Sequence, residues 1–331
     1  MTQRRLLISE RTPRLNDMNA RILTTATLAV AFTAVLPAKA ADPQLLNLVM
    51  PDAKVVAGVN VDQAKTSQFG QYVLSQMQSN DKDMQELITI TGFDPTRDVS
   101  ELLAASNGTP NTGLALARGN FDAGKIAAVA LAKGGSTETY GNATIIEDPQ
   151  KTHGVAFLSA SLVVAGDLDS VKAAIDRQRS PQPIPVDLSM QVSQWSTTQD
   201  AWAISAVAPS SLQPPASAPK VPGMNGQGPF QTIQSAAGGV KFGALVVVKA
   251  QATADNAQDA TSMGDALKLL ANLAQMQAGT DPTAAALAQS LQVSTQGNIL
   301  NVQISLPEDQ LQQIVKPKAN VKKVDRAVRH M

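Results

Sequence analysis

The sequence contains no cysteine, only two histidines and few aromatic residues, which make up 3% of the chain. Without cysteine there can be no disulfide bond, no thiolate chemistry and no lipid attached at a cysteine beside a cleavage site. Few aromatic rings are available to stack on bases or sugars, so nucleic-acid and carbohydrate binding are both disfavoured. The chain is instead rich in aliphatic side chains: 44% of its 331 residues are hydrophobic, enough for one large or two modest globular domains.

The formal charges of the chain cancel, with 27 basic and 27 acidic residues, but they are unevenly distributed. Residues 1–40 carry a net charge of +4 and residues 316–331 carry +5, which leaves −9 for residues 41–315. Because an acidic body repels phosphate backbones, we expect no nucleic-acid partner for the folded part. The basic tail, 316–331, is predicted to be a disordered, solubilising end, and contact with an anionic lipid or polymer is the alternative.

Residues 1–40 have the pattern of an export signal. The apolar run Ile22–Leu36 is followed by Ala38-Lys39-Ala40, an A-x-A cleavage site that would leave Ala41 as the first mature residue. The polar residues before Met18 indicate either a start at Met18 or an extended n-region. The apolar run has 15 residues, whereas a membrane span needs about 20. We therefore expect a periplasmic or secreted protein with no stable membrane span after cleavage.

Two similar stretches organise the rest of the chain. Gly154–Arg179 and Leu291–Val315 each have the pattern of two short strands joined by a tight turn and followed directly by a capped amphipathic helix. The strand and helix predicted before each stretch lie at 112–118 and 123–133 in the first copy and at 239–250 and 257–277 in the second. The sequence therefore predicts an α+β fold of duplicated strand–helix–strand–strand–helix units, with helices packed on mainly antiparallel sheets.

A proline-spaced segment at 180–185 separates two expected halves. The first α+β half covers 41–180 and the second covers 181–315. The second half contains a Pro/Ser/Gly-rich stretch, 209–229, which is predicted to be a flexible loop or an extended linker. Its long helix is expected to cover a sheet with a broad apolar face, formed by Met263, Leu267, Leu270, Leu273, Ala274 and Met276.

Four aspartates invite interpretation as metal ligands. Asp94 and Asp98 lie in the segment GFDPTRDV, where turn and cap roles explain both without an ion. Asp167 is placed where a helix N-cap belongs, and Asp169 lies in the first helical turn, where negative charge is favourable. We therefore predict structural roles for all four.

The segment Gly119–Ile126 matches the G-x4-G-K pattern of a phosphate-binding loop. Ile126 stands where that loop needs a hydroxyl for magnesium, so a strand-to-helix turn capped near Asp122 is the favoured interpretation. His153 and His330 are far apart and lack a carboxylate or histidine at ligand spacing. The sequence thus assigns no catalytic, cofactor-binding or metal-binding residue and implies no cofactor.

The chain resembles uncharacterised exported bacterial proteins of the domain-of-unknown-function kind. The resemblance covers most of residues 45–315 and rests on turn and packing motifs, which are Pro51-Asp52-Ala53-Lys54 before a strand ending at Asp62, GFDP at Gly92–Pro95, the strand and helix at Leu114–Val129, and LVVAGDLDSVKAAID at Leu162–Asp176. It implies a shared fold and export, and no catalytic residue.

These observations predict an exported, soluble, non-enzymatic cell-envelope protein with a binding or structural role. Its expected partner is an envelope macromolecule. One alternative is a periplasmic carrier of a hydrophobic small molecule or lipid, because long apolar helices over antiparallel sheets can enclose a cavity. A second alternative is a hydrolase that uses only carboxylates and hydroxyls, for which no residue pair can be chosen from spacing.

Overall fold

The computed structural model describes residues 40–79, 82–208, 229–276 and 282–315. The expected export signal, the expected loop at 209–229 and the basic tail at 316–331 lie outside the described residues, apart from Ala40 and Pro229. Within the described part of the chain, no helix is long and apolar enough to cross a membrane.

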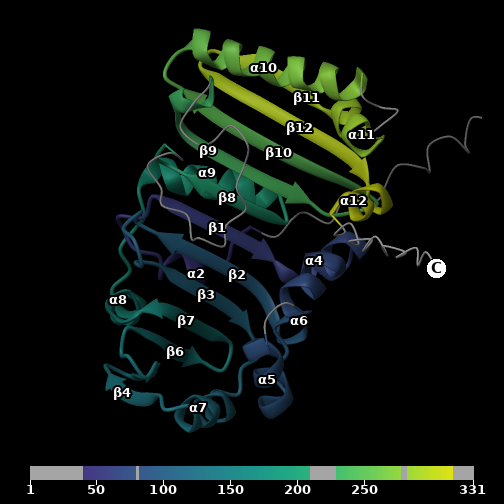
Figure 1. The fold of residues 1–331 in the computed structure, drawn as a ribbon. Coiled ribbons are helices and arrows are strands. Elements are labelled where there is room, and N and C mark those ends of the chain that lie inside the picture. The colour runs from purple at the N-terminus through teal and green to yellow at the C-terminus, as the bar shows by residue number, and fades with distance from the viewer. Residues whose placement is uncertain (1–39, 80–81, 209–228, 277–281, 316–331) are drawn as a thin grey trace, which may run out of the picture. The chain divides into compact units, whose positions relative to one another are not determined.

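The described residues form one antiparallel sheet of 12 strands, with helices packed on it (Figure 1). The spatial order of the strands is β11 (Gln292–Gln296), β12 (Ile299–Pro307), β10 (Leu245–Ala254), β9 (Ile233–Lys241), β8 (Ala201–Ser205), β1 (Val55–Asn60), β2 (Val99–Ser106), β3 (Leu114–Gly119), β7 (Leu162–Asp167), β6 (His153–Ser159), β5 (Ala143–Glu147) and β4 (Ser136–Tyr140). The predicted α+β class is therefore confirmed.

The helices mostly begin where the sequence places a cap or a proline. They are α2 (Pro43–Leu46), α3 (Val61–Ala64), α4 (Gln68–Ser79), α5 (Lys82–Thr91), α6 (Pro95–Asp98), α7 (Ala123–Ala132), α8 (Leu168–Arg179), α9 (Val186–Thr198), α10 (Ala257–Met276), α11 (Pro282–Ser290) and α12 (Glu308–Val315), with the short 3-10 helix η2 at Pro229–Thr232. Asp42, Asp94, Asp122 and Asp167 each cap a helix with a side-chain oxygen.

The duplicated strand order is visible in the sheet. In each half, three successive strands form a meander (β1-β2-β3 and β8-β9-β10), and the third pairs with the second strand of a later hairpin (β7 or β12). The first half carries an additional hairpin, β4–β5. β1 and β8 join the halves into one sheet, because they pair antiparallel from Val55↔Ser205 to Val59↔Ala201.

Successive strand residues point to opposite sides, so the sheet has two faces. We call one the α9 face; its buried strand residues include Val56, Leu103, Leu116, Val164 and Trp202. Helices α2, α8 and α9 cover this core with side chains that are equally buried, among them Leu45, Val171, Ile175, Leu188 and Val192. We call the other side the α10 face, where Ala260 and Met263 of α10 pack on Leu300 and Ala254.

The prediction of a single strand at 239–250 is wrong. β9 ends at Lys241 and β10 begins at Leu245, so this range holds the end of one strand, a turn and the start of the next. The sequence of β9, IQSAAGGVK, has few of the β-branched and aromatic residues that mark strands. Pairing with β8 on one side and β10 on the other forms it instead.

The predicted apolar face of α10 is only partly buried. Met263 is fully buried, but Leu270 is 57% exposed and Leu273 is 45% exposed. The first half of the helix packs on the sheet, whereas its end lies beside α11, where Gln275 Nε2 donates to the backbone carbonyl of Ala288 at 3.3 Å. A single neighbouring helix covers less of the surface than a sheet does, so the later leucines stay exposed.

Candidate functional site

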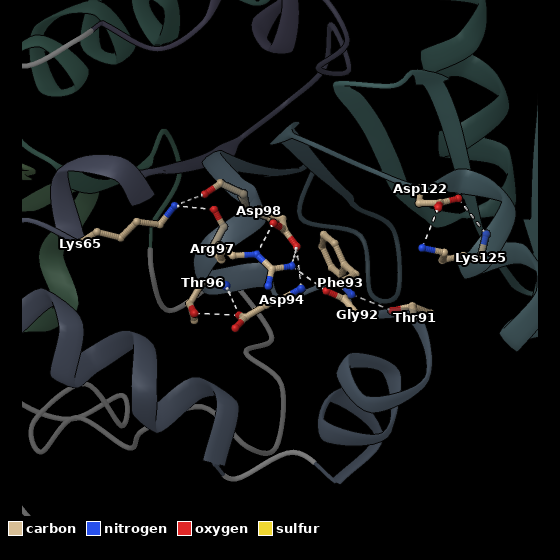
Figure 2. Close-up of polar contacts among 11 residues, drawn as sticks. Lys65, Thr91, Gly92, Phe93, Asp94, Thr96, Arg97, Asp98, Asp122 and Lys125 are labelled. Atoms are coloured by element: carbon tan, nitrogen blue, oxygen red, sulfur yellow. Dashed lines mark hydrogen bonds and ion pairs between the residues drawn. The ribbon is translucent and has the colours of Figure 1, made fainter.

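The turn that contains Asp94 and Asp98 is a closed hydrogen-bonded unit (Figure 2). Asp94 Oδ1 accepts from the backbone N–H of Thr96 at 2.9 Å and from its hydroxyl at 2.8 Å. Arg97 donates from Nε and Nη2 to the two oxygens of Asp98 at 2.7 and 2.6 Å. These bonds from Arg97 hold the pKa of Asp98 below its usual value. Both carboxylates are therefore engaged in shaping the turn.

Lys65 fastens the same turn to the end of α3. Its Nζ donates to the backbone carbonyls of Arg97 and Val99 at 3.1 and 2.8 Å (Figure 2). The same Nζ pairs with Asp62 at 3.1 Å. Throughout the described ranges, no group of three or more His, Cys, Asp or Glu side chains is placed to hold a metal ion.

The segment Gly119–Ile126 has the geometry of a capped helix start. Asp122 Oδ1 accepts from the backbone N–H of Lys125 at 3.1 Å, and Lys125 Nζ lies 3.3 Å from Asp122 Oδ2 (Figure 2). In a phosphate-binding loop the lysine contacts the phosphate. Here that lysine, Lys125, instead forms an ion pair with Asp122, the N-cap of α7.

Asp167 connects α8 with the loop before β3. Its Oδ1 accepts from the backbone N–H of Ser170 at 3.0 Å, and its Oδ2 accepts from the backbone N–H of Gly113 at 2.9 Å. Asp169 follows in the first turn of α8, where its own side chain is exposed. His153 is exposed at the start of β6, with Nδ1 2.9 Å from the hydroxyl of Thr152, and His330 lies outside the described residues.

A polar groove of about 360 Å³ lies where α9 stops covering the sheet. We define the polar groove by its lining residues, which are Gln194, Trp195, Thr198 and Gln199 at the end of α9, Lys249, Ala250 and Gln251 on β10, Gln292 and Ser294 on β11, and Asn301, Val302 and Gln303 on β12. Amide and hydroxyl side chains dominate this set, with one ammonium group and no carboxylate.

Strand register places the floor of the polar groove on the α9 face. Trp202 pairs with Gly239, and Gly239 pairs with Lys249. Paired residues of antiparallel strands share a face of the sheet. Lys249 therefore lies on the same face as the buried Trp202, and the residues that follow in this cross-strand row are polar.

The floor consists of two parallel rows of side chains that cross β10, β12 and β11. One row is Lys249, Gln303 and Gln292, and the other is Gln251, Asn301 and Ser294. Gln251 Nε2 donates to Asn301 Oδ1 at 3.1 Å, which links two members of the second row. The result is an array of donors and acceptors that can meet hydroxyl and amide groups of a ligand.

The wall of the polar groove contains two buried polar atoms without a partner. Trp195 is 6% exposed and Gln199 is 3% exposed, yet Trp195 Nε1 and Gln199 Oε1 have no hydrogen-bond partner among the described residues. A buried donor or acceptor that stays unpaired costs about 1–3 kcal/mol. Each of these two atoms has less than 1 Å² of accessible surface, so they belong to the packing behind the groove and not to its open surface.

Sequence reasoning missed the polar groove. Polar residues at every second position of β10 and β12 are also what a solvent-exposed sheet face shows, so alternation alone does not distinguish the two. The orphaned atoms of Trp195 and Gln199 depend on the packing of α9 against β9 and leave no sequence signal.

A second hollow, of about 450 Å³, lies on the α10 face beneath α7. Ile146, Val155 and Ala165, which are cross-strand neighbours on β5, β6 and β7, form its floor. Ala130 of α7, His153 and Glu147 also line it. We call this the apolar hollow, because its floor is made of aliphatic side chains.

No protein-family model and no curated protein sequence matches this chain. Its fold is similar to that of TP0453. The structure of crystal form III of TP0453 aligns with a TM-score of 0.52 at 9% sequence identity, over 82% of this chain and 96% of that one. Crystal form IV covers the same shares at 9% identity with a TM-score of 0.49. At this level of identity the likeness shows a shared fold and nothing about activity.

Proposed function

We propose that this protein is an exported, non-enzymatic binding protein of the cell envelope, and that the polar groove holds an uncharged glycan of that envelope. The observation that carries the proposal is the floor of the groove, where amide and hydroxyl side chains lie in two rows across β10, β12 and β11. The expected signal at residues 1–40 supports export.

The choice of an uncharged glycan follows from the chemistry of the lining. Amides and hydroxyls such as those of Gln251, Asn301 and Ser294 both donate and accept, as do the hydroxyl and acetamido groups of sugars. Lys249 is the single charged residue of the lining, so no strong field selects an anion or a cation. Hydrogen bonding to these amides and hydroxyls does not require the ring stacking that the low aromatic content disfavours.

The absence of a catalytic arrangement in the groove supports a non-enzymatic role. Its lining has no Asp, Glu, His or Cys among the described residues, and Lys249 is its single amine. The hydroxyl of Thr198 donates to backbone carbonyls of its own helix, those of Gln194 and Trp195, and not to Lys249.

Calorimetric titration of the protein with oligomers of N-acetylglucosamine tests the proposal. Wild type should bind with a saturable signal, and Gln251→Ala and Gln199→Leu should each weaken binding at least tenfold. Gln258→Ala, on the exposed start of α10, is the matched control and should bind as wild type does. Equal affinity in all four proteins, or no binding by wild type to these oligomers or to purified envelope glycan, would contradict it.

A second candidate function, a carrier of a hydrophobic small molecule or lipid, is favoured by the apolar hollow. Its aliphatic floor suits an acyl chain, because burying apolar surface stabilises a complex by about 25 cal/mol per Å² removed from water. Native mass spectrometry after gentle purification should then show a lipid adduct. Ala130→Glu, which places a charge at the hollow, should remove the adduct, whereas Ala128→Glu on the exposed side of α7 should retain it.

A further inference from the structure

Arg177, in the last turn of α8, is a buried cation without a carboxylate beside it. Arg177 is only 6% exposed. Nε and Nη2 both donate to one acceptor, the backbone carbonyl of Leu48, at 3.0 and 2.8 Å. Among the ion pairs of the described residues, none includes this guanidinium.

The nearest negative charges do not pair with Arg177. Burial lowers the pKa of Arg177 and outweighs the opposite effect of the more distant Asp52 and Asp176. Each of these carboxylates has a partner of its own, because Asp52 accepts from Asn107 Nδ2 at 3.0 Å and Asp176 accepts from the hydroxyl of Tyr140 at 2.9 Å. A buried charge without a direct counter-charge is costly, and proteins rarely retain one without a compensating partner.

A hollow of about 260 Å³ is lined both by Arg177 and by Leu48, the residue whose carbonyl the guanidinium contacts. Its polar lining residues are Gln44, Asn47, Ser159, Arg177 and Gln178. No carboxylate lines it, and none of these residues belongs to the polar groove. At about 30 Å³ for each water in the liquid, the space suits a small ionic group together with a few waters.

The orientation of Gln44 makes the hollow a donor site. Gln44 Oε1 accepts from Arg118 Nη2 at 2.7 Å, so its carbonyl oxygen is already used and its NH₂ remains to donate. Asp42, two residues before Gln44, is held by Arg118 at 2.8 Å. Arg177 itself has five N–H donors, of which the carbonyl of Leu48 receives two.

We propose that this hollow binds a small oxyanion, a carboxylate or phosphate group, against the free edge of the Arg177 guanidinium, with the side-chain amides of Gln44 and Asn47 as further donors. Planar guanidinium groups bind both kinds of oxyanion through paired, charge-assisted hydrogen bonds. The site is independent of the glycan-binding function proposed above.

Thermal unfolding of the full chain in chloride, acetate or inorganic phosphate at one ionic strength tests the proposal. Acetate or phosphate should raise the melting temperature saturably, and the stronger of the two identifies the class of oxyanion. Arg177→Met should lose this rise, whereas Arg179→Met should keep it, because Arg179 is exposed on the same helix and carries the same charge. A rise of equal size in the Arg177→Met protein, or no rise in wild type with either anion, would overturn the proposal.

Gln178→Glu gives an answer even where Arg177→Met fails to fold. This change places a carboxylate in the wall of the hollow beside the guanidinium. The variant should melt at a higher temperature than wild type in chloride, and its response to acetate and phosphate should fall at least tenfold in apparent affinity. A variant that is less stable than wild type and still responds fully to both anions would show that the hollow is not an oxyanion site.

Discussion

The side chain of Gln199 lies directly on the backbone of Gly239. A Cβ atom at Gly239 would be 2.5 Å from Gln199 Cγ and 2.8 Å from both Gln199 Cβ and the carbonyl oxygen of Ala201. β9 therefore lacks a side chain at the position where the amide of Gln199 enters the wall of the polar groove. This contact couples the packing of α9 on the sheet to the shape of the candidate site.

Gly239→Ala should destabilise the protein and damage the polar groove together. The added methyl group must displace Gln199 and also meets the fixed backbone at Ala201, so we expect a cost of about 1–3 kcal/mol and at least a tenfold loss of glycan affinity. Gly124→Ala in α7 is the control, because its Cβ meets nothing closer than 3.6 Å and alanine favours a helix by about 1 kcal/mol. Chemical denaturation and calorimetric titration measure the two effects, and unchanged binding by Gly239→Ala would argue against the coupling.

Gln199→Leu should separate stability from binding. Leucine is close in volume and removes a buried oxygen that has no partner, so the free energy of unfolding should stay equal or rise by up to about 1 kcal/mol. Glycan affinity should fall at the same time. A clear loss of stability measured by denaturant unfolding would indicate that Oε1 has a structural partner after all.

The stability of the protein should fall as the solution becomes acidic. Burial alone would raise the pKa of Asp167, but hydrogen bonds from the backbone of Gly113 and Ser170 outweigh it and the net pKa is lowered. A carboxyl group whose pKa is lowered by folding stabilises fully above its unfolded pKa of about 3.9, and this contribution is lost as the pH falls through the folded value. The free energy of unfolding should therefore decrease below about pH 4.

Asp167→Asn should flatten this pH dependence, because asparagine can still cap α8 but does not titrate. Asp98 should contribute with the same sign, since its pKa is also lowered, through its bonds with Arg97. Asp169→Asn, at an exposed position of the same helix, is the control. Denaturant unfolding between pH 7 and pH 3 gives the comparison, and coincident curves for Asp167→Asn and wild type would refute the assignment.

Val164→Asp should abolish cooperative folding. Val164 is 0% exposed on β7, between Leu116 and Ala156 of its neighbouring strands. A carboxylate there would be buried without a partner, which costs several kcal/mol and approaches the whole stability of a domain. Ala104→Asp, exposed on the opposite face, should retain a cooperative transition in circular dichroism. A Val164→Asp protein that melts like wild type would show that the strand is not part of the core.

Local signals in the sequence predicted the caps well. The role of Asp167 depends mainly on residues within three positions of it, and the same is true of Asp122 at the start of α7. The hairpin and helix of Gly154–Arg179 were predicted for the same reason, since periodicity and turn residues lie within one stretch of chain.

Features that depend on distant parts of the chain could not be predicted. β9 is a strand because β8 and β10 hold both its edges, although its own composition favours no strand. Arg177 looks like an ordinary cation in the last turn of a helix, and it is buried because Leu48, 129 residues earlier, supplies a carbonyl. The polar groove needs three strands and the end of α9, so no single segment carries its signature.

The pairing of β1 with β8 also constrains how the sheet is assembled. β1 can pair with β2 as soon as both have been synthesised, but its other edge has no neighbour until the whole first half has been made. Closing so long a loop is slow, and an open strand edge can meanwhile pair with another chain. Pairing of β1 with β8 is thus expected to be the rate-limiting step of folding. Until the two strands pair, the open edge of β1 makes the nascent protein prone to aggregation.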